Sequence, residues 1–241
     1  NIGLACQADR GYWRQAAETF RSAVTLAQRI GYYQGETTAL GYLIDISLKM
    51  GDVEQAEAAI EQLRALYRRT DNTYGLAIIE HQIARLCLAR KDAHSALLHL
   101  QRARQSPEVV DDCEDMAQVE TETGRAWMAL GEWEKAEAAY KRALELWALA
   151  SEWPGELETW LALVELYRQQ AAWEKLEAAL GAARDLARRI ERDDALAMLE
   201  AAAGDALFAG GQVEAACEAY LAALHRLADY GENDRQAQCY Y

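Results

Sequence analysis

Residues 131–140 read GEWEKAEAAY, and variants of the first six positions recur along the chain. The copies are GYWRQA from residue 11, GDVEQA from 51, KDAHSA from 91, AAWEKL from 171 and GQVEAA from 211. Starts at residues 11, 51, 91, 131, 171 and 211 give a period of 40 residues without slippage. A fixed period of this length is typical of a stacked repeat array rather than of a single globular core.

The positions that follow each copy have the spacing of an amphipathic helix. Ala136, Tyr140, Ala143 and Trp147 mark one apolar stripe of this segment, which we call helix B. A second helical stripe, helix A, precedes each copy, for example over residues 40–48. The repeated phrase is therefore predicted to be the turn between two antiparallel helices.

Single residues refine the predicted turns. Gly51 and Gly131 suit the left-handed position that ends helix A, and Asp52 and Asp92 can cap the next helix. The connections from helix B to the next helix A share no phrase, so we expect them to be looser. Pro107 is predicted to cut the third helix B short and to open a longer loop through the acidic run that follows.

Charge and composition limit the classes of partner. The formal net charge is −14, which disfavours binding to nucleic acid and to an anionic membrane surface. The sequence has no run of 18 or more apolar residues, so no membrane span is expected. Its five cysteines form no CxxC pair, and reduced thiols in a cytoplasmic protein are the simplest expectation. Because the chain begins and ends inside helical patterns, we interpret it as a fragment of a longer protein.

The aligned columns resemble the tetratricopeptide repeat. The family's small residue in helix A is matched by Ala84, Gly124 and Gly204, and its late aromatic by Trp127 and Tyr167. Five other positions depart from these columns: Ile44, Val164, Ser47, Cys87 and Leu207. HEAT and armadillo repeats have a similar period but lack the repeated turn. The resemblance implies an all-α right-handed superhelix, an α-solenoid of about six helix-turn-helix repeats that forms one array over residues 1–241.

With repeats of this length, the array also resembles the repeat arrays of bacterial signalling ATPases and LuxR-type regulators. Within the sequence itself there is no phosphate-binding loop, no GxSxG or HExxH motif and no paired Cys/His arrangement. We therefore expect no enzymatic activity, no catalytic residue, no cofactor and no metal site.

The resemblance implies that the A helices line a concave groove in which the family takes peptides or other ligands. Carrying the family's groove positions over by column gives a set of candidate residues: Asp45, Arg85, Arg125, Glu165 and Asp205; Leu48, Leu88, Met128, Arg168 and Phe208; and Thr38, Ile78, Gln118, Glu158 and Met198, with His81 and Thr121 beside them.

Two readings of these columns stay open. Arg85 and Arg125 could clamp a carboxylate or phosphate, because guanidinium binds such groups bidentately. Alternatively they pair with Glu80, Glu120 or Glu122 and neutralise the groove. The apolar column could contact a partner helix or pack between adjacent A helices.

The function that follows is a non-catalytic scaffold for a protein or peptide. One alternative is an effector-sensing segment of a signalling ATPase or transcription regulator, with a small molecule in the groove. Another is a self-association module that forms a homodimer through its end repeats, because an open array leaves apolar end faces.

Overall fold

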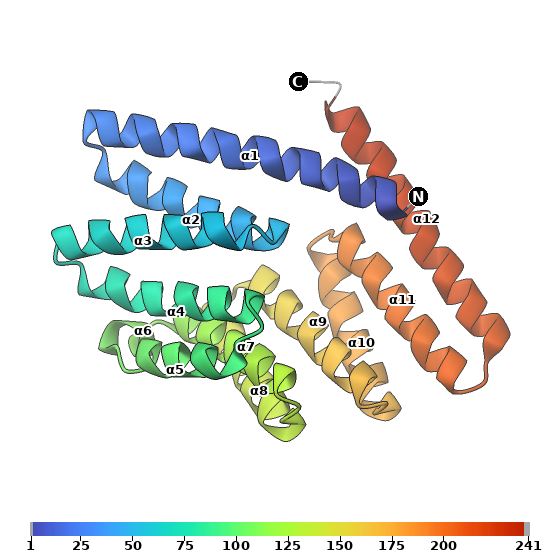
Figure 1. Ribbon diagram of the computed structural model, residues 1–241. Coiled ribbons are helices and arrows are strands. Elements are labelled where there is room, and N and C mark those ends of the chain that lie inside the picture. The colour runs from blue at the N-terminus through green and yellow to red at the C-terminus, as the bar shows by residue number, and fades with distance from the viewer. Residues whose placement is uncertain (1, 239–241) are drawn as a thin grey trace. The chain divides into compact units, whose positions relative to one another are not determined.

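The computed structural model describes the backbone of residues 2–238 and the side chains of residues 12–107 and 109–228. Within that backbone the chain is a succession of twelve α-helices joined by short connections, without a strand (Figure 1). The predicted all-α class is confirmed. The helices are α1 (Ile2–Ile30), α2 (Tyr33–Met50), α3 (Val53–Arg69), α4 (Thr73–Ala89), α5 (Ala93–Ala103), α6 (Pro107–Asp111), α7 (Cys113–Ala129), α8 (Trp133–Ala150), α9 (Trp153–Gln169), α10 (Trp173–Arg189), α11 (Asp193–Ala209) and α12 (Val213–Gln238).

The chain divides into two compact units. Unit 1 is Asn1–Leu130 and contains α1 to α7, and unit 2 is Gly131–Tyr241 and contains α8 to α12. Inside each unit, helices that follow one another in the chain pack together, and neighbouring A helices such as α2 and α4 also touch. Each unit is therefore a stack of helical hairpins. The prediction of one continuous array over residues 1–241 stays a prediction.

Most of the turns between helices share one backbone geometry. At Gly51, φ is 74°, the Gly51 amide donates to the Leu48 carbonyl at 3.1 Å, and the Asp52 amide donates to the Ser47 carbonyl at 2.9 Å. This is the hydrogen-bond pattern of a Schellman motif. Left-handed residues occur at intervals of twenty along the chain, interrupted at residue 111: Gly31, Gly51, Asp71, Lys91, Gly131, Ser151, Ala171, Glu191 and Gly211.

Outside the third repeat, the connections from helix B to helix A are therefore as tight as the A-to-B turns, and the prediction that they are looser is wrong there. At Asp71 the next amide donates to the Tyr67 carbonyl at 2.9 Å, as in the glycine turns. This similarity cannot be seen in the sequence, because the motif is defined by one left-handed residue and two backbone hydrogen bonds. Residues other than glycine can also adopt the left-handed conformation, at some energetic cost.

The predicted helix caps are confirmed. The Asp52 carboxylate accepts a hydrogen bond from the Gln55 amide at 3.0 Å, and the Asp92 carboxylate accepts one from the Ser95 amide at 3.1 Å. Asn72 caps α4 in the same way, by accepting from the Gly75 amide at 2.7 Å. Caps of this kind satisfy amides that have no partner within the helix, and they fix where each helix begins.

The alternation of small and large residues forms the core of each hairpin. Ala136, Tyr140 and Ala143 on α8 have no exposed surface, and Ala56 and Ile60 on α3 are at most 1% exposed. The small side chains let a neighbouring helix approach closely, and the large ones fill the space between helices. The predicted stripe of helix B is thus the packing face.

The third repeat departs from the others, as Pro107 predicted. Helix α5 has only 11 residues, and Pro107 begins the five-residue helix α6. The expected long loop is wrong, because the acidic run continues as helix: the Asp112 carboxylate accepts from the amides of Glu114 and Asp115 and so caps α7. Acidic side chains are favourable at this end of a helix because they complement its dipole.

The first predicted turn is also wrong. Residue 11 lies inside α1, which runs without interruption from Ile2 to Ile30 (Figure 1). A continuous helix keeps the backbone hydrogen bonds that a turn at this position would break. Cys87, Cys113 and Cys217 are free thiols, and Cys6 and Cys239 lie outside the residues whose side chains are described.

Candidate functional site

Three A helices of unit 1 bring predicted groove residues into contact. Arg85 on α4 donates through Nη1 to the Asp45 carboxylate on α2 and to Gln82 Oε1, the latter at 2.9 Å. Its Nε lies 3.9 Å from Glu122 Oε1 on α7, and Arg125 Nη1 lies 2.7 Å from the same oxygen. We call Asp45, Gln82, Arg85, Glu122 and Arg125 the A-face network.

Glu122 is the buried centre of this network. Its side chain is 10% exposed, against 22% for Arg85 and 39% for Arg125. A buried carboxylate is stable only when charged or hydrogen-bonding groups surround it. Glu122 therefore holds both guanidinium groups, while the outer part of the network remains open to the surface.

The network is neutral, since two guanidinium groups face two carboxylates. Of the three glutamates predicted as partners, Glu122 is the one that both arginines contact. Glu80 lies 2.8 Å from His99 Nδ1, and Glu120 lies 2.6 Å from Arg104 Nη2. Clamping of an acidic ligand stays a prediction, and such a ligand would compete with Asp45 and Glu122 for the guanidinium groups.

His81 is buried, at only 5% exposure, and the charges of the A-face network act on its imidazole. Its Nε2 atom is buried and has no hydrogen-bond partner in the described structure. Desolvation lowers the pKa of His81 to about 4, although the nearby Glu122 carboxylate opposes that shift. The imidazole is thus neutral at pH 7, and its burial contradicts the prediction that it offers a contact in the groove.

Sequence reasoning missed two members of the network, Gln82 as a contact and Glu122 as its centre. The sequence does contain a signal for both residues. Gln82 and Glu122 occupy the same column of the 40-residue repeat, and each precedes an arginine, Arg85 or Arg125, by three residues. Residues three apart are neighbours on a helix surface. Glu122 also belongs to a buried polar stretch, residues 120–123 of α7, which is unusual in a core built mainly from alanine and leucine.

Comparisons with known proteins agree on the architecture. BtubC from P. vanneervenii is 17% identical, with 95% of this chain and 93% of that chain covered and a TM-score of 0.67. A Rap protein complexed with competence and sporulation factor is 15% identical over 94% of this chain, with a TM-score of 0.75, and this chain spans 64% of its length. The kinesin light chain TPR-like repeats of Podosopora anserina are 19% identical over 90% of this chain and 98% of that one, with a TM-score of 0.60.

The fold is tetratricopeptide-like. No protein-family model and no curated protein sequence matches the chain. The further resemblance to LuxR-type regulators and signalling ATPases stays a prediction.

The other predicted columns of the tetratricopeptide-like array are less uniform. Leu48, Leu88 and Met128 are partly buried in unit 1, whereas Phe208 in unit 2 is 62% exposed. In the third column Thr38, Glu158 and Met198 are exposed, and Ile78 and Gln118 are partly buried; Thr121, beside that column, is buried. The apolar column is therefore half-buried in unit 1 and reaches the surface at Phe208, and its contact with a partner helix stays a prediction.

The A helices of unit 2 carry a second, more exposed ion-pair group. Arg168 binds Glu165 through Nε and Nη2, both at 2.8 Å, and lies 3.3 Å from Asp205. The Tyr220 hydroxyl donates to Asp205 at 2.7 Å. Glu165, Arg168 and Asp205 were all predicted groove residues, and the structure brings them together. Their side chains are between 37% and 40% exposed, so this group lacks the buried centre found in unit 1.

Two further findings concern metals and membranes. Among the residues whose side chains are described, no three His, Cys, Asp or Glu side chains lie close enough to hold a metal ion. In the same part of the chain, no helix combines the length and apolar character that crossing a bilayer requires.

Proposed function

We propose that this tetratricopeptide-like chain is a non-catalytic scaffold that binds a protein segment or peptide on the A-helix surface of unit 1. The observation that carries the proposal is the A-face network, in which one buried carboxylate, Glu122, orients two guanidinium groups from different helices. A polar network of this kind is not needed to stack helices through small apolar residues, but it preorganises donors and acceptors for a partner.

An aromatic side chain lies beside the network. Tyr42 stands one turn before Asp45 on α2, is 52% exposed, and stacks on Phe20 of α1 with ring centroids 5.0 Å apart. Exposed aromatic rings next to oriented charges are the composition expected of a binding hot spot. The partner surface that fits is a segment with an apolar anchor for Tyr42 and polar groups for Asp45 and Arg125, rather than a purely acidic ligand.

The fold comparisons support this class of function without fixing the partner. One similar structure is a Rap protein in complex with competence and sporulation factor, so an array of this architecture takes a binding partner. An effector-sensing role and self-association through the end repeats stay predictions; Asn1 and Tyr241 themselves lie outside the described residues.

Selection of short peptides from a random library against the 241-residue chain tests the proposal. Peptides that bind should lose most of their affinity for Tyr42→Ala and for Arg125→Gln. The matched controls are Tyr32→Ala, at 54% exposure, and Arg68→Gln on α3, which is also exposed. Equal binding to the face variants and the controls would contradict the proposal, as would a library that yields no binder.

Neutralising substitutions are needed in this test. Changing Arg85 and Arg125 to glutamate would place two new carboxylates against Asp45 and Glu122, and like charges at this distance destabilise the fold. The loss of binding in such a variant would then report unfolding as well as lost contacts.

A further inference from the structure

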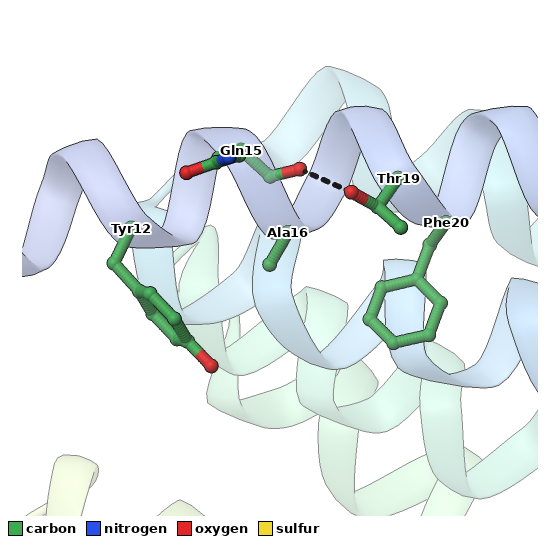
Figure 2. A pocket seen from close by; sticks show the side chains of 5 residues that line it. All are labelled: Tyr12, Gln15, Ala16, Thr19 and Phe20. Carbon is green, nitrogen blue, oxygen red and sulfur yellow. Dashed lines mark hydrogen bonds between the residues drawn. The ribbon is translucent and has the colours of Figure 1, made fainter. Parts of the chain in front are cut away.

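One face of α1 is hollowed between Tyr12 and Phe20. The hollow has a volume of about 330 Å³ and is lined by Tyr12, Gln15, Ala16, Thr19 and Phe20. Figure 2 shows Tyr12, Ala16 and Phe20 projecting from the same side of α1, so these three side chains form a mainly apolar wall. None of the five lining residues carries a charge. The hollow therefore suits an uncharged, largely apolar group.

Aromatic contacts hold both ends of the hollow in place. At one end the Tyr12 ring meets Trp13 edge-on, with ring centroids 5.7 Å apart. At the other end Phe20 stacks on Tyr42, with ring centroids 5.0 Å apart. Trp13 and Phe20 in turn pack against the buried core of unit 1. Because these walls are already fixed, a ligand that enters the hollow pays less for ordering them.

The polar side of the hollow distinguishes α1 from other B helices. Thr19 stands in the column that holds Ala59, Ala139 and Ala179, which are at most 8% exposed. A small apolar residue at this position serves packing against another helix. Thr19 is instead exposed, and its hydroxyl donates to the carbonyl of the exposed Gln15 at 2.9 Å. Polar residues here are typical of a surface that is wet when no partner is bound, rather than of a permanently packed one.

The hollow is continuous with the proposed binding face. Phe20, which closes one end of the hollow, stacks on Tyr42, and Tyr42 stands three residues before Asp45 on α2. Residues three apart lie side by side on a helix surface. Tyr42 also occupies the column of Gln82 and Glu122, two members of the A-face network. A segment bound to the network can therefore extend over Tyr42 into the hollow.

We propose that the hollow seats one large apolar side chain, leucine, methionine or an aromatic residue, of the segment that binds the A-face network. This role of the hollow rests on the function proposed above, and it adds the seat of the apolar anchor. A volume of about 330 Å³ is space for about ten water molecules, so the hollow admits one or two large side chains. It lies at the lower end of the range for small-molecule pockets, which is about 300–1,000 Å³.

Substitutions that fill the hollow test the proposal in the full chain. Figure 2 shows the Ala16 side chain between Tyr12 and Phe20, so Ala16→Trp places an indole where the anchor would lie. Peptides selected from the random library should bind this variant about 10- to 100-fold more weakly than the wild type, because one large apolar side chain then stays in water. The matched control is Ala58→Trp on α3, an exposed alanine of another B helix, which should leave the affinity unchanged.

A second variant and a change in the peptide make the result specific. Thr19→Arg puts a charge at the exposed side of the hollow and should also weaken binding, which keeps the test valid if the tryptophan disturbs the fold. Each large apolar residue of a selected peptide is then replaced by alanine in turn. One replacement should weaken binding to the wild type but weaken binding to Ala16→Trp no further, because both changes remove the same contact.

Comparison with Arg125→Gln separates this proposal from the proposed function. If Arg125→Gln weakens binding while Ala16→Trp and Thr19→Arg bind like the control, the proposed function stands and the role of the hollow is overturned. If none of the three variants weakens binding, both proposals fail. Weaker binding to the α1 variants alone would show that the hollow acts apart from the network, and additive losses for every peptide replacement would show that no apolar side chain occupies it; either result overturns the proposal.

Discussion

Removing the Glu122 carboxylate should destabilise unit 1 more than any exposed acidic substitution. In Glu122→Ala the guanidinium groups of Arg85 and Arg125 lose the carboxylate oxygen that lies 3.9 Å from Arg85 Nε and 2.7 Å from Arg125 Nη1. Breaking a fully buried ion pair costs about 3–5 kcal/mol. Because Arg85 keeps Asp45 and Gln82, and Arg125 is partly solvated, we expect a loss of about 2–3 kcal/mol in the free energy of unfolding.

Urea unfolding followed by circular dichroism measures this loss. The matched control is Glu177→Ala on α10, an exposed glutamate in a helix interior, which should change the free energy of unfolding by less than about 0.5 kcal/mol. Combining Glu122→Ala with Arg125→Gln should cost less than the sum of the two single changes, because both remove the same contact. If Glu122→Ala behaves like Glu177→Ala, or if the double variant is additive, the buried carboxylate does not organise the two arginines.

Two further predictions test the turns and the effect of pH. Ala171→Gly should raise the free energy of unfolding by about 0.5–1 kcal/mol, because alanine is strained at φ 52°. Gly51→Ala should lower the free energy of unfolding by about 1–2 kcal/mol. Both changes are measured by urea unfolding, and the reverse signs would refute the turn assignment. Burial alone would raise the pKa of Glu137, but hydrogen bonds from Lys141, Lys175 and Tyr167 lower it from 4.5 to about 2. The stability that the folded-state carboxylate contributes is therefore complete above about pH 5 and is lost as pH falls toward 2. The difference in unfolding free energy between the wild type and Glu137→Gln should shrink over that interval in a pH series, and a constant difference would show that the lysine contacts do not act.

The repeat phrase was sufficient to predict the hairpins, the left-handed glycines and the aspartate caps, because all three depend on residues close together in the sequence. The phrase failed at residue 11, where the outcome depends on whether a partner helix covers α1. The repeat phrase also could not show that the turns at Asp71 and Glu191 are tight. Backbone hydrogen bonds, rather than a particular side chain, define these turns.

The candidate site was predictable as a set of columns but not as a network. Column alignment placed Asp45, Arg85 and Arg125 on one face, and the structure brings them together. The burial of His81 and the central position of Glu122 depend on how deeply α7 packs beside α4. That depth is set by contacts between residues about forty positions apart, which a single sequence does not display.

The most direct test of the account is the location of a bound peptide. A peptide selected from the random library and carrying a photoreactive group should cross-link to α2, α4 and α7 of unit 1, near Tyr42, Arg85 and Arg125. Mapping of the cross-linked residues by mass spectrometry shows where the peptide lies. Cross-links confined to the B helices α3 and α5, or to unit 2, would contradict the claim that the A-helix surface of unit 1 is the binding face.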